Sequence, residues 1–399
     1  MRRSFSKPTS NRGGKVFRNN KFGNKRPKQQ GKYINPQMFV NKAVHPQAED
    51  IFEPNHKFSD FAFSQLIKQN IEKKGYVEPT PIQDGTIKHA LEGKDVIGLA
   101  NTGTGKTAAF VLPIIEKLSS SNDGSTALIM APTRELAFQI YEELKVFAAG
   151  TGVHAALCVG GASMNAQIHA LKRRPRVVIG TPGRLKDLLD KGILRLDRAN
   201  TIVLDEADRM VDIGFIREIR YILGKLPEKK QALCFSATLT ADIKDLLKNL
   251  MTDPVTVSVI KAATSNHVEQ DVIKASTKEE KIQILTELLK RDNFEKVIVF
   301  GSTKHGVQKL SDNLVKSDVS AIAIHGNKSQ PQRQKALDAF KKGKVKVLVA
   351  TDVAARGLDI PLVSHVINFD QPQTYDDYIH RIGRTGRAGN RGHALTFVS

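Results

Sequence analysis

Residues 95–107 constrain this chain most, because a short apolar run leads there into a glycine-punctuated turn. After the apolar residues 96–100 the sequence reads Asn-Thr-Gly-Thr-Gly-Lys-Thr, and helix-forming residues follow. This pattern predicts a buried strand, a phosphate-binding loop and a helix. Lys106 would neutralise the terminal phosphates, and the Thr107 hydroxyl would bind magnesium. Ala100 stands where the general motif has glycine, so a plain strand-turn-helix remains the alternative.

Length and composition indicate a two-domain protein of the reducing cytoplasm. A chain of 399 residues is too long for one compact core. It has no apolar run near the ~18 residues of a membrane helix and no apolar signal segment at its start. Cys158 and Cys234 lie in apolar runs, which favours buried thiols over a disulfide or a metal site. The net charge of +20 points to a polyanionic partner.

The N-terminal residues carry much of this charge. Residues 1–48 contain 12 Lys or Arg and no Asp or Glu, and the rest of the chain is still basic, with 49 against 41. Such a composition buries too little apolar surface to offset the entropy of ordering, so we predict a disordered basic arm. Contact with nucleic acid is the functional interpretation, and a solubilising tail is the alternative.

Alternating strands and helices follow the phosphate loop, as in a parallel sheet covered on both faces. The strand-like runs are residues 126–130, 155–159, 176–179, 201–204 and 232–235. Most of these runs end in polar turns, where an open α/β sheet binds its ligands. Asp205 and Glu206 directly follow one strand, which suits a carboxylate on the magnesium side and a second one that orients water.

The residues before the loop predict two helices. Apolar residues recur at helical spacing over residues 61–71, and Gly75 is expected to end that helix. Pro79 and Pro81 would keep the link extended and start the next helix, which fixes the direction of Gln83. Spacing alone indicates that Gln83 is a surface polar residue.

The second half repeats the pattern without a second Gly-Lys-Thr. Residues 251–268 lack a sustained period and suggest a linker, after which residues 297–300 and 345–350 again resemble buried strands. Arg381, Arg384 and Arg387 recur every three residues and would line one face of a helix. Arginines so placed could reach a phosphate across a domain gap, and a solvated basic face is the alternative.

Taken together, residues 58–399 resemble the DEAD-box RNA helicases, with every motif present in order. The matching stretches are Phe58 with residues 75–83 (Q motif), 100–107 (motif I), 132–137, 160–161 and 181–185 (RNA contacts), 205–208 (motif II), 236–238 (motif III), 297–303 (motif IV), 330–333 (Gln-x-x-Arg), 351–359 (motif V) and 380–387 (motif VI).

The resemblance implies two tandem RecA-like α/β domains with parallel sheets. We expect a disordered basic arm at residues 1–50, an ATP-binding domain at 51–257, a short linker at 258–267 and a second domain at 268–399. The implied cofactors are ATP and Mg²⁺. Two features fall outside the family pattern: the basic arm, and a final strand that is not followed by the closing helix common in relatives.

The resemblance also implies roles for single residues. Those expected to bind ATP are Phe58, Tyr76, Gln83, Thr102, Gly103, Thr104, Gly105, Lys106, Thr107 and Asp359. Those expected to act in catalysis are Lys106, Asp205, Glu206, Arg381 and Arg384, with Thr107 and Asp205 on the metal. Those expected to contact the RNA backbone are Thr133, Arg134, Gly161, Thr181, Gly183, Arg184, Arg333 and Thr351. Those expected to couple the two activities are Asp208, Ser236, Thr238 and His380.

The implied activity is that of a monomeric, RNA-dependent ATPase that binds single-stranded or short duplex RNA regardless of sequence. ATP and RNA would close the two domains, a short duplex would separate locally, and hydrolysis would release the RNA. One alternative is an ATP-gated RNA clamp or annealing chaperone. Another is a DNA-directed motor. The sequence names no protein partner and predicts no membrane contact.

Overall fold

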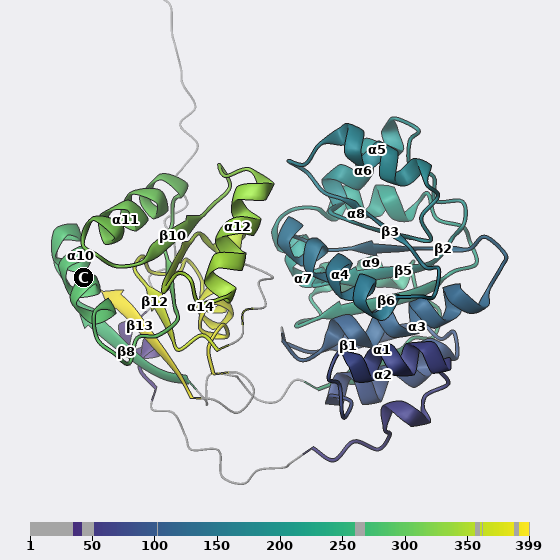
Figure 1. Cartoon of the computed structure of the whole chain (residues 1–399), viewed down its shortest axis with the longest axis horizontal. Coiled ribbons are helices and arrows are strands. Elements are labelled where there is room, and N and C mark those ends of the chain that lie inside the picture. Colours follow the sequence, from purple (N-terminus) through teal and green to yellow (C-terminus); the bar gives the residue numbers. More distant parts are fainter. Residues whose placement is uncertain are drawn as a thin grey trace, which may run out of the picture. The chain divides into compact units, whose positions relative to one another are not determined.

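Two parallel β-sheets organise the chain (Figure 1). The computed structural model describes residues 35–41, 52–101, 103–259, 268–355, 360, 362–386 and 391–398. Some predictions lie outside these residues: those for Thr102, Asp359 and Arg387, for residues 1–34 and 42–50 of the arm, and for most of the linker. The strand order is β3-β4-β2-β5-β6-β1-β7 in the first sheet and β10-β11-β9-β12-β13-β8 in the second. The predicted pair of α/β parallel-sheet domains is therefore confirmed.

The first sheet is built from seven strands. They are β1 (Val96–Leu99), β2 (Thr126–Met130), β3 (Ala155–Cys158), β4 (Val177–Gly180), β5 (Ala199–Asp205), β6 (Gln231–Ser236) and β7 (Val255–Ser258). The helices that accompany them are η2 (Phe58–Asp60), α1 (Gln65–Lys73), α2 (Pro81–Leu91), α3 (Lys106–Ser120), α4 (Arg134–Phe147), α5 (Met164–Lys172), α6 (Pro182–Asp190), α7 (Ala207–Asp212), α8 (Ile216–Leu223) and α9 (Ala241–Lys248).

The second sheet is built from six strands. They are β8 (Val268–Lys274), β9 (Val297–Phe300), β10 (Ala321–Ile324), β11 (Val347–Ala350), β12 (His365–Asn368) and β13 (Gly392–Val398). The helices that accompany them are α10 (Lys278–Leu289), α11 (Lys304–Lys316), α12 (Gln330–Lys341), α13 (Asp352–Ala355) and α14 (Tyr375–Ile382), and a 3₁₀ helix η1 (Pro36–Phe39) precedes the first domain.

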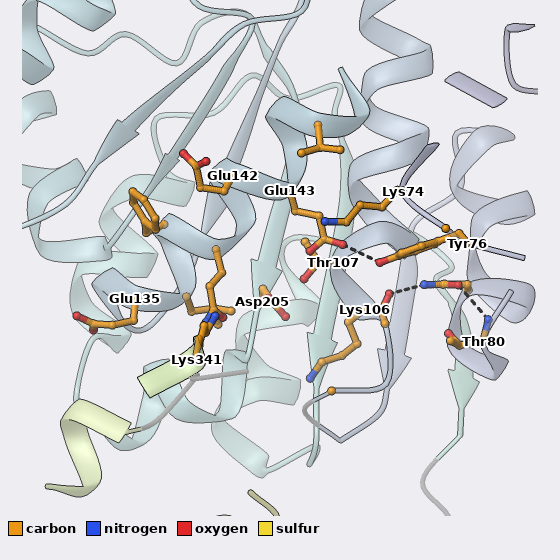
Figure 2. Close-up of a pocket in the computed structure, with 18 of the residues that line it drawn as sticks. Lys74, Tyr76, Thr80, Lys106, Thr107, Glu135, Glu142, Glu143, Asp205 and Lys341 are labelled. Atoms are coloured by element: carbon orange, nitrogen blue, oxygen red, sulfur yellow. Dashed lines mark hydrogen bonds between the residues drawn. The ribbon is translucent and has the colours of Figure 1, made fainter. Parts of the chain in front are cut away.

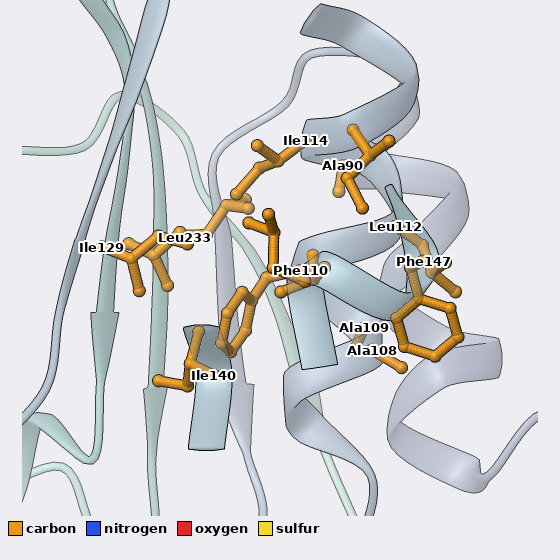
Figure 3. Close-up of a cluster of buried hydrophobic side chains, with 14 of the residues drawn as sticks. Ala90, Ala108, Ala109, Phe110, Leu112, Ile114, Ile129, Ile140, Phe147 and Leu233 are labelled. Carbon is orange, nitrogen blue, oxygen red and sulfur yellow. The ribbon is translucent and has the colours of Figure 1, made fainter. Parts of the chain in front are cut away.

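Apolar side chains cover both faces of the first sheet. Alternate residues of a strand point to opposite faces, so Ile129 of β2 joins one core cluster whereas Leu128 and Met130 join another. Figure 3 shows the first cluster, in which Phe110 of α3 lies close to Ile140 of α4. Burial on both faces explains why these strands are apolar runs without polar alternation. Both sheets belong to a compact unit that spans Ile34–Ser399.

Several sequence predictions need correction. Helix α1 begins at Gln65, so Phe61 and Phe63 precede it, although both are buried. No strand was predicted in residues 251–257, but β7 pairs in parallel with β1 and extends the first sheet to Ser258. Its outward residues are exposed at the sheet edge, which explains its weak apolar pattern.

The N-terminal arm prediction also fails in part. Asn35–Asn41, which was assigned to the disordered arm, contains η1 and a buried Phe39. This was hard to predict, because Met38, Phe39 and Val40 form an apolar run of only three residues within a polar segment.

Both cysteines are buried, as predicted. Burial raises the pKa of Cys158 to about 12, which disfavours a reactive thiolate. Among the residues that the structure describes, no helix has the length and apolarity needed to span a membrane.

Candidate functional site

The phosphate loop connects β1 to α3 and is shaped by its glycines. Gly103 and Gly105 adopt φ values of 81° and 90°, which disfavour any side chain. A Cβ atom at Gly105 would also lie 2.5 Å from the Gln83 amide nitrogen. These glycines therefore allow the loop backbone to turn tightly before the first helical residue, Lys106.

Lys106 and Asp205 meet at the carboxyl edge of the first sheet. Lys106 is buried, and its ammonium group donates to the Ala100 carbonyl at 3.0 Å. Asp205 ends β5, and its buried Oδ1 atom has no hydrogen-bond partner among the residues that the structure describes. Burial raises the pKa of Asp205 to about 7, although the nearby Lys106 cation opposes the rise. The positive charge of Lys106 therefore does not offset the cost of burying the Asp205 carboxylate.

Glu206 differs from its neighbour because it has a close cation. It adopts a left-handed φ of 53°, and its carboxylate forms an ion pair with Arg209 at 3.0 Å. Burial alone would raise the pKa of Glu206, but Arg209 and Lys106 lower it below its ordinary value. Glu206 is therefore ionised and fixed, as a water-orienting carboxylate requires.

Gln83 is not a surface residue, contrary to the spacing argument. Only 1% of Gln83 is exposed. It occupies the third position of α2, accepts from the Thr80 amide at 2.9 Å and donates to the Gly105 carbonyl at 3.0 Å. Gln83 therefore ties the start of α2 to the phosphate loop, a tertiary role that periodicity does not reveal.

A cavity of about 1020 Å³ extends along these groups. Figure 2 shows Lys106, Thr107, Asp205 and Tyr76 around it, with the Tyr76 hydroxyl donating to Glu143 at 3.0 Å. The ring of Phe58 lies 6.0 Å from that of Tyr76 and is buried behind it. The structure thus brings together the predicted adenine and phosphate residues that it describes. Those that line the cavity are Tyr76, Gln83, Gly103, Gly105, Lys106, Thr107, Asp205, Glu206 and Arg384.

The predicted arginines have different surroundings. Arg384 lines the cavity, whereas Arg381 is bound within its own domain, with two bonds to Asp352 at 2.6 and 2.8 Å. Helix α14 ends at Ile382, so Arg381 and Arg384 do not share a helical face as predicted. Gly383 forms the helix C-cap, and its poor helix propensity explains the end. Both arginines are buried, which excludes the solvated basic face.

The predicted coupling residues form a connected network. The Asp208 carboxylate accepts from the backbone amides of Ala237 and Thr238 at 2.9 and 3.1 Å. The Ser236 hydroxyl accepts from the Asp208 amide and donates to the Thr238 carbonyl. The turn after β6 is therefore fixed to the start of α7, directly beside the carboxylates of β5.

Arg209 is a functional residue that the sequence analysis missed. Its guanidinium group contacts both Glu206, at 3.0 Å, and the His380 ring, at 3.3 Å. The signal was present, because opposite charges three residues apart at a helix start favour an ion pair.

The predicted RNA contacts of the first domain gather at one edge of the sheet. Strands β3, β4 and β2 are neighbours, and their carboxyl ends lead into the turns that carry these residues. The Thr133 hydroxyl caps α4 at the Leu136 amide, and Arg134 lies against Gly161. The remaining members of this group are Thr181 at the N-cap of α6, Gly183 within α6, and Arg184, which donates to the Ala162 carbonyl.

The two predicted RNA contacts of the second domain, Arg333 and Thr351, have different surroundings. Arg333 of α12 is buried and forms a 2.7 Å ion pair with Glu135 of α4. Burial raises the pKa of Glu135, and the Arg333 cation limits the rise. Thr351 follows β11, and its carbonyl accepts from the first turn of α13.

Comparisons with known proteins agree with this geometry. The family model for DEAD/DEAH box helicases matches residues 80–246, and the model for the helicase conserved C-terminal domain matches residues 280–389. The DEAD-box ATP-dependent RNA helicase CshA of Geobacillus kaustophilus is 47% identical over 86% of this chain and 73% of its own length. The chain belongs to the DEAD-box helicase family.

Solved structures of this family share the fold of the chain. Saccharomyces cerevisiae Dbp5 bound to RNA and ADP BeF3 matches with a TM-score of 0.74 and 30% identity, over 86% of this chain and 89% of that one. The DEAD-box helicase Mss116 bound to ssRNA and UDP-BeF matches with a TM-score of 0.79 and 32% identity, over 90% of this chain and 77% of that one. The two parallel-sheet domains are therefore RecA-like, as expected.

Proposed function

We propose that this DEAD-box family member is an RNA-dependent ATPase that separates short RNA duplexes and releases RNA after hydrolysis. The observation that carries the proposal is the buried Asp205 carboxylate, which lies near Lys106 at a large cavity and whose Oδ1 has no hydrogen-bond partner in the described part of the chain. A buried carboxylate of this kind is costly unless a ligand supplies positive charge.

The donor set fits Mg²⁺ with a nucleotide triphosphate. Asp205 and the Thr107 hydroxyl offer the oxygen ligands that Mg²⁺ prefers. Bound there, Mg²⁺ would neutralise charge on the phosphates. Lys106 would bind the terminal phosphates, and Glu206 would orient the attacking water. Gln83, Tyr76 and Phe58 would bind the adenine, with Gly103, Thr104 and Gly105 around the phosphates.

The second domain would complete this site. Arg384 lines the cavity and would stabilise the charge that develops in the transition state. Arg381 would act with it after exchanging partners, or would position α14 through its bonds to Asp352. The coupling residues Asp208, Ser236, Thr238 and His380 would link hydrolysis to the RNA surface.

RNA would bind the residues at the carboxyl ends of β2, β3 and β4, together with Arg333 and Thr351. Backbone amides, hydroxyls and arginines suit phosphate contacts that ignore base sequence. Arg333 would have to leave Glu135 to make such a contact. We further propose that the protein acts as a monomer and that it works in the cytoplasm. Its two buried, free cysteines support a reducing compartment.

Hydrolysis and strand release test the proposal together. ATP turnover is measured with RNA and with DNA of one sequence, and release of a labelled strand from a short RNA duplex is followed. We expect RNA to stimulate turnover, DNA to stimulate far less, and the strand to be released. Equal stimulation by DNA would favour a DNA-directed motor. Turnover in which RNA stays protected after hydrolysis would favour an RNA clamp or annealing chaperone.

A further inference from the structure

The segment Asn35–Asn41, here named the N-terminal anchor, packs on the second domain although it precedes the first in sequence. The Asn41 amide donates to the Gln270 carbonyl at 3.0 Å, and the Gln270 amide donates to the Asn41 carbonyl at 2.8 Å. This antiparallel bridge lies at β8, the edge strand of the second sheet. The anchor therefore covers part of an otherwise unpaired sheet edge.

The anchor has its own local structure. The Asn35 side chain accepts from the Gln37 amide at 3.0 Å, and Pro36 opens the 3₁₀ helix. An Asn cap followed by proline favours such a turn before any tertiary contact forms. The turn directs Phe39 toward the second domain, since Phe39 is 0% exposed while Met38 and Val40 are 47% and 51% exposed.

Phe39 completes a small apolar cluster at this edge. The cluster consists of Phe39, Val268, Tyr378, Ile382, Ala394 and Val398. The ring centroids of Phe39 and Tyr378 are 4.7 Å apart at 54°, which is a favourable tilted arrangement. Strands β8 and β13 and helix α14 thus share one core with a residue from outside their domain.

Hydrogen bonds connect the polar groups around this cluster. The Tyr378 hydroxyl donates to the Gln270 side-chain oxygen at 2.9 Å, and the Gln270 backbone is the partner of Asn41. Phe39 and Asn41 therefore contact the two ends of the same Tyr378–Gln270 pair. Loss of Phe39 would leave a void against Tyr378, the largest fully buried side chain among the described residues.

Tyr378 lies on α14, the helix that contains the first residues of motif VI. Helix α14 also contains His380 and Arg381, and Arg384 follows two residues after its end. Phe39 is not among the described residues that line the cavity. Among its cluster partners, Tyr378 and Ile382 belong to α14, so the position of α14 is the most direct route from Phe39 to the site.

We propose that the N-terminal anchor is a positioning element of the second domain, in which Phe39 acts through Tyr378 to fix α14, which contains Arg381 and leads into Arg384. The same contacts give the segment 35–41 a function separate from that of the basic residues before it. The catalytic consequence rests on the proposed ATPase function. The placement of α14 does not, and it is measured without ATP.

The first measurement is hydrogen exchange of the full chain without ligands. In Phe39→Ala we expect the amides of Tyr375–Ile382 to exchange about tenfold faster, while those of α3 in the first domain stay unchanged. Met38→Ala is the matched control, because Met38 lies in the same turn but is half exposed. Phe39→Leu keeps an apolar side chain and should restore most of the protection.

The second measurement is the steady-state kinetics of the same variants with saturating RNA. Because misplaced arginines weaken only the transition state, we expect kcat to fall about tenfold in Phe39→Ala, with a change in KM for ATP below about twofold. Unchanged exchange in α14 would overturn the positioning role whatever the activity. Faster exchange with an unchanged kcat per folded molecule would reduce the anchor to a stability element and would contradict the proposal.

Discussion

The two domains hold their charged side chains in different ways. In the first domain, as far as its residues are described, one Asp205 oxygen has no hydrogen-bond partner, and Lys106 donates to the Ala100 carbonyl. In the second domain Arg381 already has three partners: Asp352, the Asn368 side chain and the Asp370 carbonyl. The first domain is therefore prepared for a ligand, whereas the second must be positioned or rearranged to act.

This difference suggests a division of labour between the domains, in which the first binds ATP and the second acts in the transition state of hydrolysis. The phosphate loop is shaped by its own backbone, so we expect the unit of β1, loop and α3 to provide much of the energy that binds the phosphates. Arg381 is held by contacts with α13 and β12, and in our proposal the N-terminal anchor also fixes α14. Substitutions in the first domain should thus impair binding and chemistry, and substitutions in the second should impair chemistry.

The strongest test on the first domain is Lys106→Ala. Loss of the ammonium group should lower ATP hydrolysis by ~10³-fold or more, because the phosphates lose their fixed cation. RNA binding without nucleotide should largely survive, since Lys106 faces the cavity and not the RNA edge of the sheet. The assay is RNA-stimulated ATP turnover with a parallel RNA binding curve. Lys94→Ala, at an exposed lysine just before β1, serves as control, and near-normal turnover in Lys106→Ala would refute the site assignment.

A smaller effect is expected at the RNA edge. Gly161 has a φ of 74°, and a Cβ atom there would lie 2.0 Å from an Arg134 guanidinium nitrogen. Gly161→Ala should displace Arg134 and weaken RNA binding by about tenfold, with ATP affinity unchanged. Gly152→Ala is the matched control, because Gly152 has a φ of 76° and open space around it. Equal losses in both variants would attribute the effect to backbone strain alone.

The basic arm should affect the affinity for RNA and leave kcat almost unchanged. Residues 1–33 contain 11 Lys or Arg, and each phosphate contact adds about −0.7 to the slope of log affinity against log salt for single strands. If half of them engage, deletion of residues 1–33 should flatten the slope by ~4. The deletion spares the N-terminal anchor, so kcat should change by less than about twofold. Parallel salt lines for the two proteins would show that the arm does not bind RNA.

Local pattern predicted the parts of the structure that local chemistry determines. The phosphate loop, the predicted core strands and the carboxylates after β5 follow from apolar runs, glycines and turn residues. Gln83 shows the limit, because its burial arises from contact with Gly105, which lies far along the chain. Phe39 illustrates this limit of local pattern more strongly, since its partner Tyr378 belongs to the opposite end of the sequence.

Single breaks in periodicity were equally hard to predict. A three-residue arginine spacing suggested one helical face, but Gly383 ends α14 before Arg384. Strand β7 has exposed alternate residues, so nothing in its sequence separated it from a linker. In both cases the outcome depends on which neighbours pack against the segment.

The most direct test of the division of labour is to measure ATP affinity and kcat separately in Arg384→Ala. The account predicts that kcat with saturating RNA falls by ~10³-fold, as for a lost arginine finger, while the dissociation constant for ATP changes by less than about threefold. Arg384→Lys keeps the charge but loses the planar guanidinium, so its kcat should lie between those of the unaltered protein and Arg384→Ala. Loss of ATP affinity with kcat preserved would contradict the account, because Arg384 would then belong to the binding site that the first domain is held to provide.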